Sequence, residues 1–148
     1  MTVAEYPKGV ARIDHRPRLT QVVVSDQLDD EPDGPDPCYA AAACTPDGEL
    51  LVAVRCAPPA LVVTPTGCRT RPSDGSGHDS EFPLPSERLI LLSCSAFEAV
   101  SDLLVEGVRT TPDRLLDEAP AALLIALLGL GGTGAGAVID HHPTKGQP

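Results

Sequence analysis

Within residues 87–100, with the sequence ERLILLSCSAFEAV, the spacing of apolar residues changes from that of a buried strand to that of a helix. This change decides the fold. The first part ends in an unbroken apolar run, which is typical of a short strand buried on both faces. From Ser95 onward the apolar residues fall at helical spacing, and Gly107 marks the end of that helix. The stretch therefore predicts a central strand, a sharp turn at residues 93–95 and an amphipathic helix.

The chain before this stretch predicts strands. Residues 19–25 (LTQVVVS), 38–44 (CYAAAAC), 49–55 (ELLVAVR) and 60–64 (ALVVT) are apolar, and most are rich in β-branched side chains. Pro46-Asp47-Gly48 has the residues that a tight turn requires.

The chain after it predicts a second helix and a last strand. Thr111-Pro112 opens the helix, Pro120 breaks or kinks it, and residues 137–140 (AVID) follow as a short strand. This order predicts an α+β layered domain, with a mostly antiparallel sheet covered by two C-terminal helices.

The length of 148 residues is about that of one domain, so we expect a single domain over residues 1–148. Residues 1–18 are polar and broken by proline, which predicts an N-terminal arm or a short edge strand. Residues 26–37 (DQLDDEPDGPDP) predict an acidic, mobile loop. We expect residues 141–148 to form a disordered tail.

Composition narrows the range of partners. The net charge of −10 repels phosphate backbones and anionic lipid headgroups, so we expect neither nucleic acid nor a membrane as a partner. The N-terminus has no signal-peptide pattern, and the apolar stretch at residues 119–130 is shorter than the roughly 20 residues that span a bilayer. An odd number of cysteines, five, then predicts reduced thiols and a cytoplasmic protein.

Three segments carry a resemblance to a known family. They are residues 49–63 (ELLVAVRCAPPALVV) with the following Pro65-Thr66-Gly67, residues 88–99 (RLILLSCSAFEA), and residues 112–116. From Cys38 onward their order is similar to the C-terminal half of the PPM-type (type 2C) metal-dependent protein phosphatases, in the sporulation stage II branch. The resemblance implies a truncated phosphatase-like fold, in which Glu98 stands at the Glu of a family helix.

The same resemblance implies that the metal-binding carboxylates of the family are missing. In that family, carboxylates hold two metal ions that activate a water for attack on a phosphoester. Cys94 stands at the metal-binding Asp of the family's Thr-Asp-Gly step, and Ser95 stands at its Gly. Cys56 takes the place of a His beside the Pro-Pro step, and Gly134 and Ala135 fall near a terminal Asp-Asp pair. The family's N-terminal Gly-Asp motif and its Asp-Val-x-Gly-x-Gly segment are also expected to be absent.

Because Mg²⁺ and Mn²⁺ prefer hard oxygen ligands, the resemblance implies no bound metal and no other cofactor. The vestigial pocket that remains consists of Cys56, Cys94 and Glu98. One alternative is a residual metal-dependent phosphatase. Another is a thiol-dependent enzyme in which Cys94, beside Ser95 at a helix N-terminus, is the nucleophile and His15 or His78 is the base. A small buried thiol at that turn is the plain structural explanation.

Other candidate ligand sets are incomplete. Cys38 and Cys44, and Cys56 and Cys68, lack the short spacing of zinc-ligand pairs. The adjacent residues 141–142 (HH) would point to opposite sides of a strand.

The acidic loop and a glycine-rich segment resemble ion and phosphate sites only in part. Residues 29–34 (DDEPDG) resemble half of a calcium loop, but Ala40 stands where a bidentate Glu is needed. Residues 129–136 (GLGGTGAG) follow a helix instead of opening one, so we expect a connector and not a phosphate-binding loop.

The sequence therefore favours a catalytically inactive phosphatase-like domain that acts as a protein–protein interaction or regulatory module. Its partner would be another protein or a second copy of the chain. A dimer would form through an apolar sheet face or through the helix at residues 119–130, which is apolar nearly all round. With the N-terminal half of the family fold missing, one sheet face would lack its helical cover.

Overall fold

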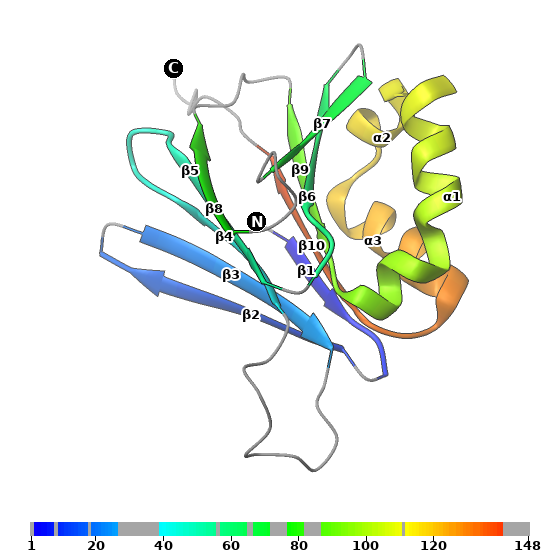
Figure 1. Cartoon of the computed structure of the whole chain (residues 1–148), viewed down its shortest axis with the longest axis horizontal. Coiled ribbons are helices and arrows are strands. Elements are labelled where there is room, and N and C mark those ends of the chain that lie inside the picture. Colours follow the sequence, from blue (N-terminus) through cyan, green and yellow to red (C-terminus); the bar gives the residue numbers. More distant parts are fainter. Residues whose placement is uncertain are drawn as a thin grey trace.

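Two five-stranded antiparallel sheets and three helices make up the part of the chain that the structure describes (Figure 1). The computed structural model describes residues 2–7, 9–17, 19–26, 39–55, 57–64, 67–71, 77–81, 87–110 and 112–140. Sheet A contains, in spatial order, β1 (Thr2–Glu5), β10 (Ala135–Asp140), β9 (Arg88–Leu92), β6 (Ala60–Thr64) and β7 (Gly67–Arg71). Sheet B contains β2 (Gly9–Arg16), β3 (Leu19–Asp26), β4 (Tyr39–Cys44), β5 (Leu50–Arg55) and β8 (Gly77–Glu81). The helices are α1 (Cys94–Thr110), α2 (Pro112–Asp117) and α3 (Pro120–Gly131).

Burial along the strands shows which faces are covered. In β5, Leu50, Val52 and Val54 are almost fully buried, whereas Leu51 between them is 38% exposed. This alternation is typical of a strand with one covered face. In β9 all five residues are buried, because both faces of sheet A are covered. The strand predicted at residues 87–92 is therefore the central strand of its sheet, as expected.

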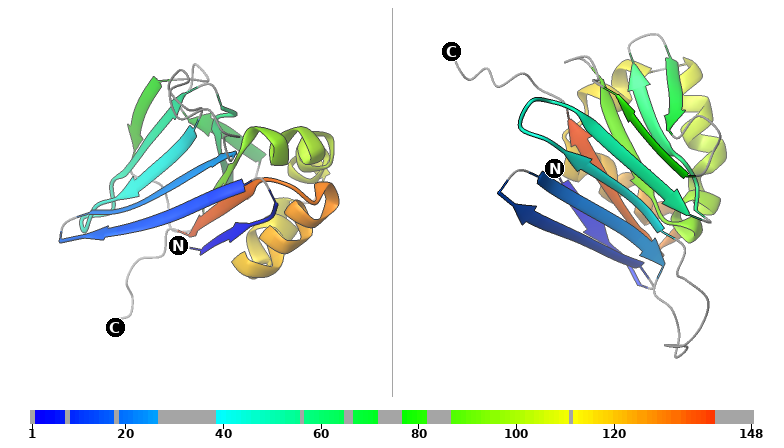
Figure 2. Two further views of the ribbon diagram at one scale, coloured as in Figure 1. Left: turned by 90° about the horizontal axis from the view of Figure 1, so that it is seen from below. Right: turned by 60° about the vertical axis from the view of Figure 1, so that its left-hand side comes forward.

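The molecule has three layers, and one apolar core lies between each pair of neighbouring layers (Figure 2). The first core lies between the sheets, where Val22 and Val52 of sheet B are in one cluster with Val62 and Leu91 of sheet A. The second lies between the other face of sheet A and the helices, and it includes Ile90 of β9. The layers are therefore sheet B, sheet A and the helices, in that order.

The predicted fold class, an α+β layered domain with one mostly antiparallel sheet covered by two C-terminal helices, is wrong. The described strands form two sheets packed face to face, and three helices cover sheet A on its outer face. The chain crosses from sheet B to sheet A between β5 and β6, past Pro58 and Pro59, and it crosses again on either side of β8. Apolar periodicity predicts that a segment is a strand but does not say which sheet the strand joins.

The N-terminal segment forms edge strands, whereas most of the acidic loop and the whole tail lie outside the described residues. The segment in which we expect an arm or a short edge strand contains β1 and β2, which are edge strands of sheets A and B. Of the acidic loop, Asp26 is the last residue of β3, and residues 27–37 lie outside the described residues. Residues 141–148 also lie outside them.

Local chemistry explains the turns and the helix ends. The turn predicted at Pro46-Asp47-Gly48 is present, with a φ of 95° at Gly48 and a hydrogen bond of 3.0 Å from its N–H to the Thr45 carbonyl. Pro120 starts a new helix, α3, because a missing N–H is harmless in the first turn. Gly132 ends that helix with a φ of 68°, and its N–H donates to the Leu128 carbonyl. Only residues 132–134 of the glycine-rich segment form the predicted connector, because residues 129–131 belong to α3 and residues 135–136 to β10.

A buried arginine, Arg88, joins sheet A to the helical layer. Arg88 of β9 pairs with Asp140 of β10, and Nη1 of Arg88 also donates to the carbonyls of Leu115 and Glu118, both at 2.7 Å. One side chain therefore connects sheet A with the end of α2 and the segment before α3.

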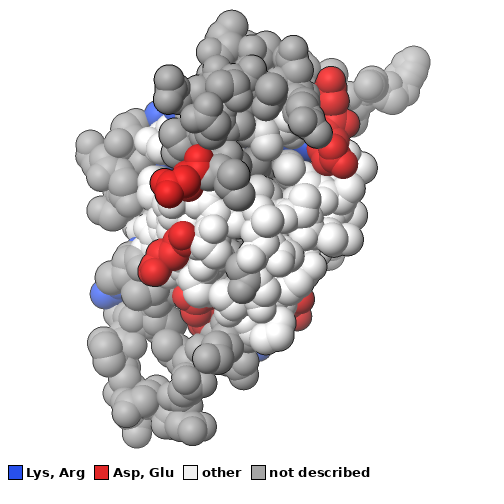
Figure 3. All heavy atoms as spheres, turned by 90° about the vertical axis from the view of Figure 1, so that its right-hand side faces the viewer, with Lys and Arg blue, Asp and Glu red and all other residues white. Residues whose placement is uncertain are grey.

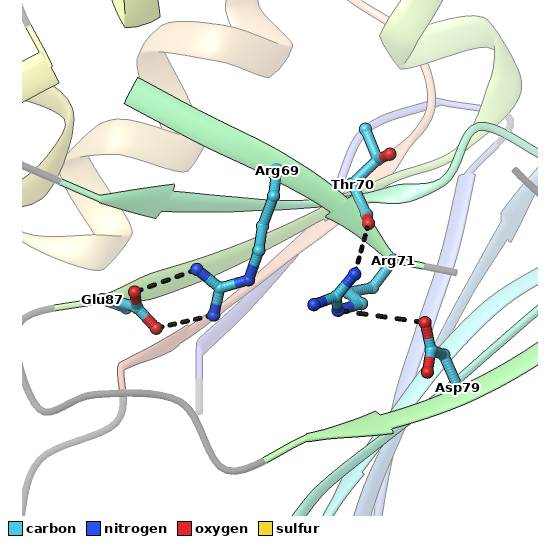
Figure 4. Close-up of polar contacts among 5 residues, drawn as sticks. All are labelled: Arg69, Thr70, Arg71, Asp79 and Glu87. Atoms are coloured by element: carbon cyan, nitrogen blue, oxygen red, sulfur yellow. Dashed lines mark hydrogen bonds and ion pairs between the residues drawn. The ribbon is translucent and has the colours of Figure 1, made fainter. Parts of the chain in front are cut away.

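Further charged contacts lie along β7 (Figure 4). Arg69 holds Glu87 through two hydrogen bonds of 2.9 and 2.7 Å. Arg71 points instead toward sheet B and pairs with Asp79 of β8 at 3.9 Å. These two arginines anchor the start of β9 and tie together the edge strands of the two sheets.

Candidate functional site

The candidate site is the corner at which the end of β3, the start of α1 and the start of β10 meet. It consists of Asp26, Ser93, Cys94, Ser95, Gly134 and Ala135, and we call it the β3–α1–β10 corner. It contains Cys94 and Ser95, the residues singled out in the sequence as possible catalytic groups, and both residues near the expected terminal Asp-Asp position.

Ser93 forms the sharp turn predicted between strand and helix. It is the single residue between β9 and α1, and it is 1% exposed. Its N–H donates to the Ala135 carbonyl at 2.9 Å, and its Oγ accepts from the Ala135 N–H at 3.0 Å. These two bonds fix the position of Cys94, the first residue of α1, which is half-buried and not in a disulfide.

Asp26 provides the negative charge at the N-terminus of α1. Its Oδ2 accepts a hydrogen bond from the Ser95 N–H at 3.0 Å, and its Oδ1 accepts one from Ser95 Oγ at 2.6 Å. A carboxylate at this position satisfies unpaired N–H groups of the first turn and interacts favourably with the helix dipole. Asp26 belongs to the acidic loop predicted at residues 26–37, so it is not among the site residues predicted from the sequence. Its position directly after the β-branched run at residues 19–25 was the available signal.

Close backbone packing seals the corner. Gly134 has a φ of 94°, and a Cβ placed on it would lie 2.6 Å from Ser93 Oγ and 2.8 Å from Ser95 Oγ. A Cβ on Gly9 would lie 2.0 Å from the carbonyl carbon of Gly134. The segment before Gly9 is fixed to the same place, because the Tyr6 N–H donates to the Gly134 carbonyl at 2.8 Å. Glycine is therefore required at both positions by space.

The donor atoms of the corner do not fit a pair of Mg²⁺ or Mn²⁺ ions. Asp26 is the one carboxylate among the corner residues, and each of its oxygens accepts a hydrogen bond from Ser95. Cys94 presents a soft thiol, whereas these ions select hard oxygen ligands. Gly134 has no side chain and no room for one. Across the described residues, no group of three or more His, Cys, Asp or Glu side chains is placed to hold a metal ion.

Of the remaining residues of the predicted pocket, the structure describes Glu98 but not Cys56. Glu98 is four residues after Cys94 on α1, so the two share a helix face, and Glu98 is exposed. Cys56 lies outside the described residues. The same holds for Cys38, for the histidines at 141–142 and for residues 29–34, and the side chain of Cys68 is not described either.

The two histidines considered as bases are remote from Cys94. His15 pairs with Thr20, six residues before Asp26 on β3, which corresponds to about 20 Å along the strand. His78 lies on β8, three strands away from β3, or about 14 Å across the sheet. Neither can take a proton directly from the Cys94 thiol.

Cys44, at the opposite end of sheet B, has a different environment. It pairs with Thr20 and with Leu50 and is half-buried. Burial raises the pKa of the Cys44 thiol, because a thiolate loses hydration there. This cysteine is therefore held as a thiol.

No protein-family model matches the sequence, and no curated protein matches it. The structure, however, is similar to the crystal structure of the RsbU and RsbW domains of Rv1364c from Mycobacterium tuberculosis, with a TM-score of 0.65 and 14% sequence identity. That similarity covers 93% of this chain and 57% of the other. It is also similar to the PP2C phosphatase domain and regulatory-domain fragment of SpoIIE from Bacillus subtilis, with a TM-score of 0.64 and 11% identity over 95% of this chain and 62% of that one.

These likenesses define the class of the fold: a PPM-type phosphatase fold, shared at low sequence identity. The resemblance inferred from the sequence is confirmed at this level. The chain spans about three fifths of the length of the solved structures that it matches. None of the helices in the described part is long and apolar enough to cross a bilayer.

Proposed function

We propose that the chain is a catalytically inactive domain of the phosphatase fold that works by binding another protein, in a regulatory role. The observation that carries the proposal is the sealed β3–α1–β10 corner, in which a single carboxylate caps a helix. Two-metal hydrolysis needs several oxygen ligands around an open, shaped site. Here Asp26 is engaged by Ser95, and the backbones of Gly9 and Gly134 lie against each other.

The outer face of α3 supports the binding part of the proposal. Ile125 and Leu130 are 58% and 60% exposed. The twelve-residue helix on which they lie contains no charged side chain. A surface helix normally has a polar outer face, so an apolar one indicates a contact surface. Figure 3 shows the side of the molecule that carries the helices, where a broad uncharged area lies between scattered acidic residues.

A second copy of the chain is the occupant that suits this helix face. Two molecules that each carry a net charge of −10 repel each other, so contact is favoured where charge is absent. A two-fold axis requires only that one patch be complementary to itself. Sedimentation equilibrium at micromolar concentration should show a dimer for the wild type and a monomer for Ile125→Glu. A wild type that stays monomeric would remove this part of the proposal.

The inactive state is tested by catalysis and by metal binding. We expect no turnover of an aryl phosphate above background with Mn²⁺ or Mg²⁺, and no change in melting temperature on adding either ion. An active phosphatase of the same fold is the positive control. Turnover that requires Mn²⁺, disappears on chelation and is lost in Asp26→Asn would show that the domain is an enzyme.

A further inference from the structure

The outer face of sheet B lacks a helical layer within the described part of the chain, whereas sheet A has three helices on its outer face (Figure 2). Strand register places two rows of outward side chains across sheet B, since directly paired residues share a face. The first row is Arg12, Val23, Ala41, Ala53 and His78. The second row is Asp14, Gln21, Ala43, Leu51 and Ser80.

The middle of this face is hollow. An open groove of about 640 Å³ lies over β4 and β5, and we call it the sheet B groove. Ala41, Ala43 and Ala53 form its floor, where the side chains end at Cβ. Longer side chains line its two sides, with Gln21 on β3 and His78 on β8. Few polar groups converge in it, which does not favour a small polar ligand.

The dimensions suit an α-helix. The groove lies between β3 and β8, three strand spacings apart, which is about 14 Å. A helix with its side chains is roughly 10–12 Å across. A floor of alanines lets a helix approach the sheet closely, and Leu51, which is 38% exposed, offers an apolar contact within the groove. On sheet A, the same molecule shows a sheet face of this size covered by helices.

The charges around the groove point to the partner's chemistry. Among the described residues, the charged side chains on the outer face of sheet B are Arg12, Arg16, Arg55 and Asp14. Arg16 pairs with Asp14 at 2.8 Å, whereas Arg12 makes no ion pair within the described part of this strongly acidic chain. Acidic groups on a partner would be attracted to this face and repelled by the rest of the molecule.

We propose that the sheet B groove binds one amphipathic α-helix of another protein, with its apolar face against Ala41, Ala43 and Leu51 and acidic residues along its flanks beside Arg12. The inference rests on the proposed function, for which it names the surface and the class of partner. It is distinct from the self-contact through α3, which lies on the opposite side of the molecule.

A displayed library of helical peptides tests the groove directly. Peptides of about 14 residues would match a six-residue strand, since both span about 20 Å. Selection on the intact chain should enrich an apolar stripe at i, i+3, i+4 and i+7, flanked by Asp and Glu. The selected peptides should bind Leu51→Glu at least about tenfold more weakly, the loss expected for a central interface contact. Arg12→Glu should weaken acidic-flanked peptides more than neutral-flanked ones.

Matched controls separate the possible results. Ala53→Glu provides a second groove variant, and circular dichroism confirms that each variant is folded. Ile125→Glu, on the far side, should leave peptide affinity unchanged. No enrichment, enrichment of basic flanks, or equal binding to Leu51→Glu would each overturn the inference. A dimer abolished by Leu51→Glu and not by Ile125→Glu would overturn it in favour of a second copy in the groove. Mn²⁺-dependent turnover reports separately on the proposed function.

Discussion

Gly134 and Gly77 have the same φ of 94° but opposite surroundings. A Cβ on Gly134 would meet Ser93, Ser95 and Ala96 within 2.8 Å, whereas a Cβ on Gly77 would meet nothing within 4 Å. The pair therefore separates the cost of a left-handed backbone from the cost of filling the β3–α1–β10 corner.

Gly77→Ala should lower the free energy of unfolding by about 1–2 kcal/mol, the cost of a side chain at positive φ. Gly134→Ala should cost clearly more, because the added methyl group also has to displace packed atoms, which typically adds about 1–3 kcal/mol. Urea denaturation of both variants measures the difference. Equal losses would mean that the corner has room for a side chain.

Removal of the Asp26 carboxylate should destabilise the start of α1. We expect Asp26→Ala to cost about 1–2 kcal/mol, as for other lost helix caps. A double-mutant cycle with Ser95→Ala should give a coupling energy of at least about 0.5 kcal/mol, since the two side chains share a hydrogen bond of 2.6 Å. Strictly additive losses would contradict the capping role.

The ion pair between Arg88 and Asp140 should matter far more than the one between Arg16 and Asp14. The side chains of the first pair are 6% and 18% exposed, and those of the second 67% and 55%. Arg88→Met leaves a carboxylate and two carbonyls without their donor, so we expect a loss of about 3–5 kcal/mol. Arg16→Met should cost less than about 1 kcal/mol. Chemical denaturation measures the free energy of unfolding of both variants. Similar losses would show that the burial of the Arg88–Asp140 pair does not determine its contribution to stability.

Alkylation distinguishes the cysteines. Cys44 should react with iodoacetamide more slowly in the native protein than in the unfolded protein at neutral pH, because its raised pKa leaves less thiolate in the folded state. Peptide mapping by mass spectrometry measures each site, with the unfolded protein as the control. Very fast labelling of Cys94 alone would instead revive the thiol-dependent enzyme as an alternative.

The same raised pKa sets the sign of a pH effect on stability. The folded state holds the Cys44 proton more tightly than the unfolded state does, so this contribution is complete below the ordinary thiol value of about 8.5. It is lost as the pH rises toward and through the higher pKa of the folded state. Cys44→Ala should therefore reduce the alkaline loss of stability. An unchanged alkaline slope would show that Cys44 does not cause it.

Local elements were predictable from the sequence because their causes are local. The apolar run at residues 88–92, the turn ending at Gly48 and the helix start at Pro120 each follow from side-chain chemistry within a few residues. The division of the strands into two sheets was not predictable. It depends on where the chain crosses between layers after Pro59, and apolar alternation is the same in either sheet.

The candidate site was predictable only in part for a similar reason. Cys94 and Ser95 stand out at a strand–helix junction, which a single sequence reveals. The contact between Asp26 and Ser95 joins residues that are 69 positions apart, and no local pattern records it. The sealing of the corner by Gly9 against Gly134 is equally long-range, since it arises only once the strands are assembled.

The pairing of β1 with β10 has a consequence for biosynthesis. Thr2 lies opposite Val138 and Glu5 opposite Ala135, so the first of the described strands hydrogen-bonds with a strand that is made after α1, α2 and α3. A nascent chain cannot complete sheet A until β10 has emerged, and closing so long a loop is slow. We therefore expect sheet A to be completed after translation of residue 140, with the edge of β1 that pairs with β10 exposed to chaperones until then.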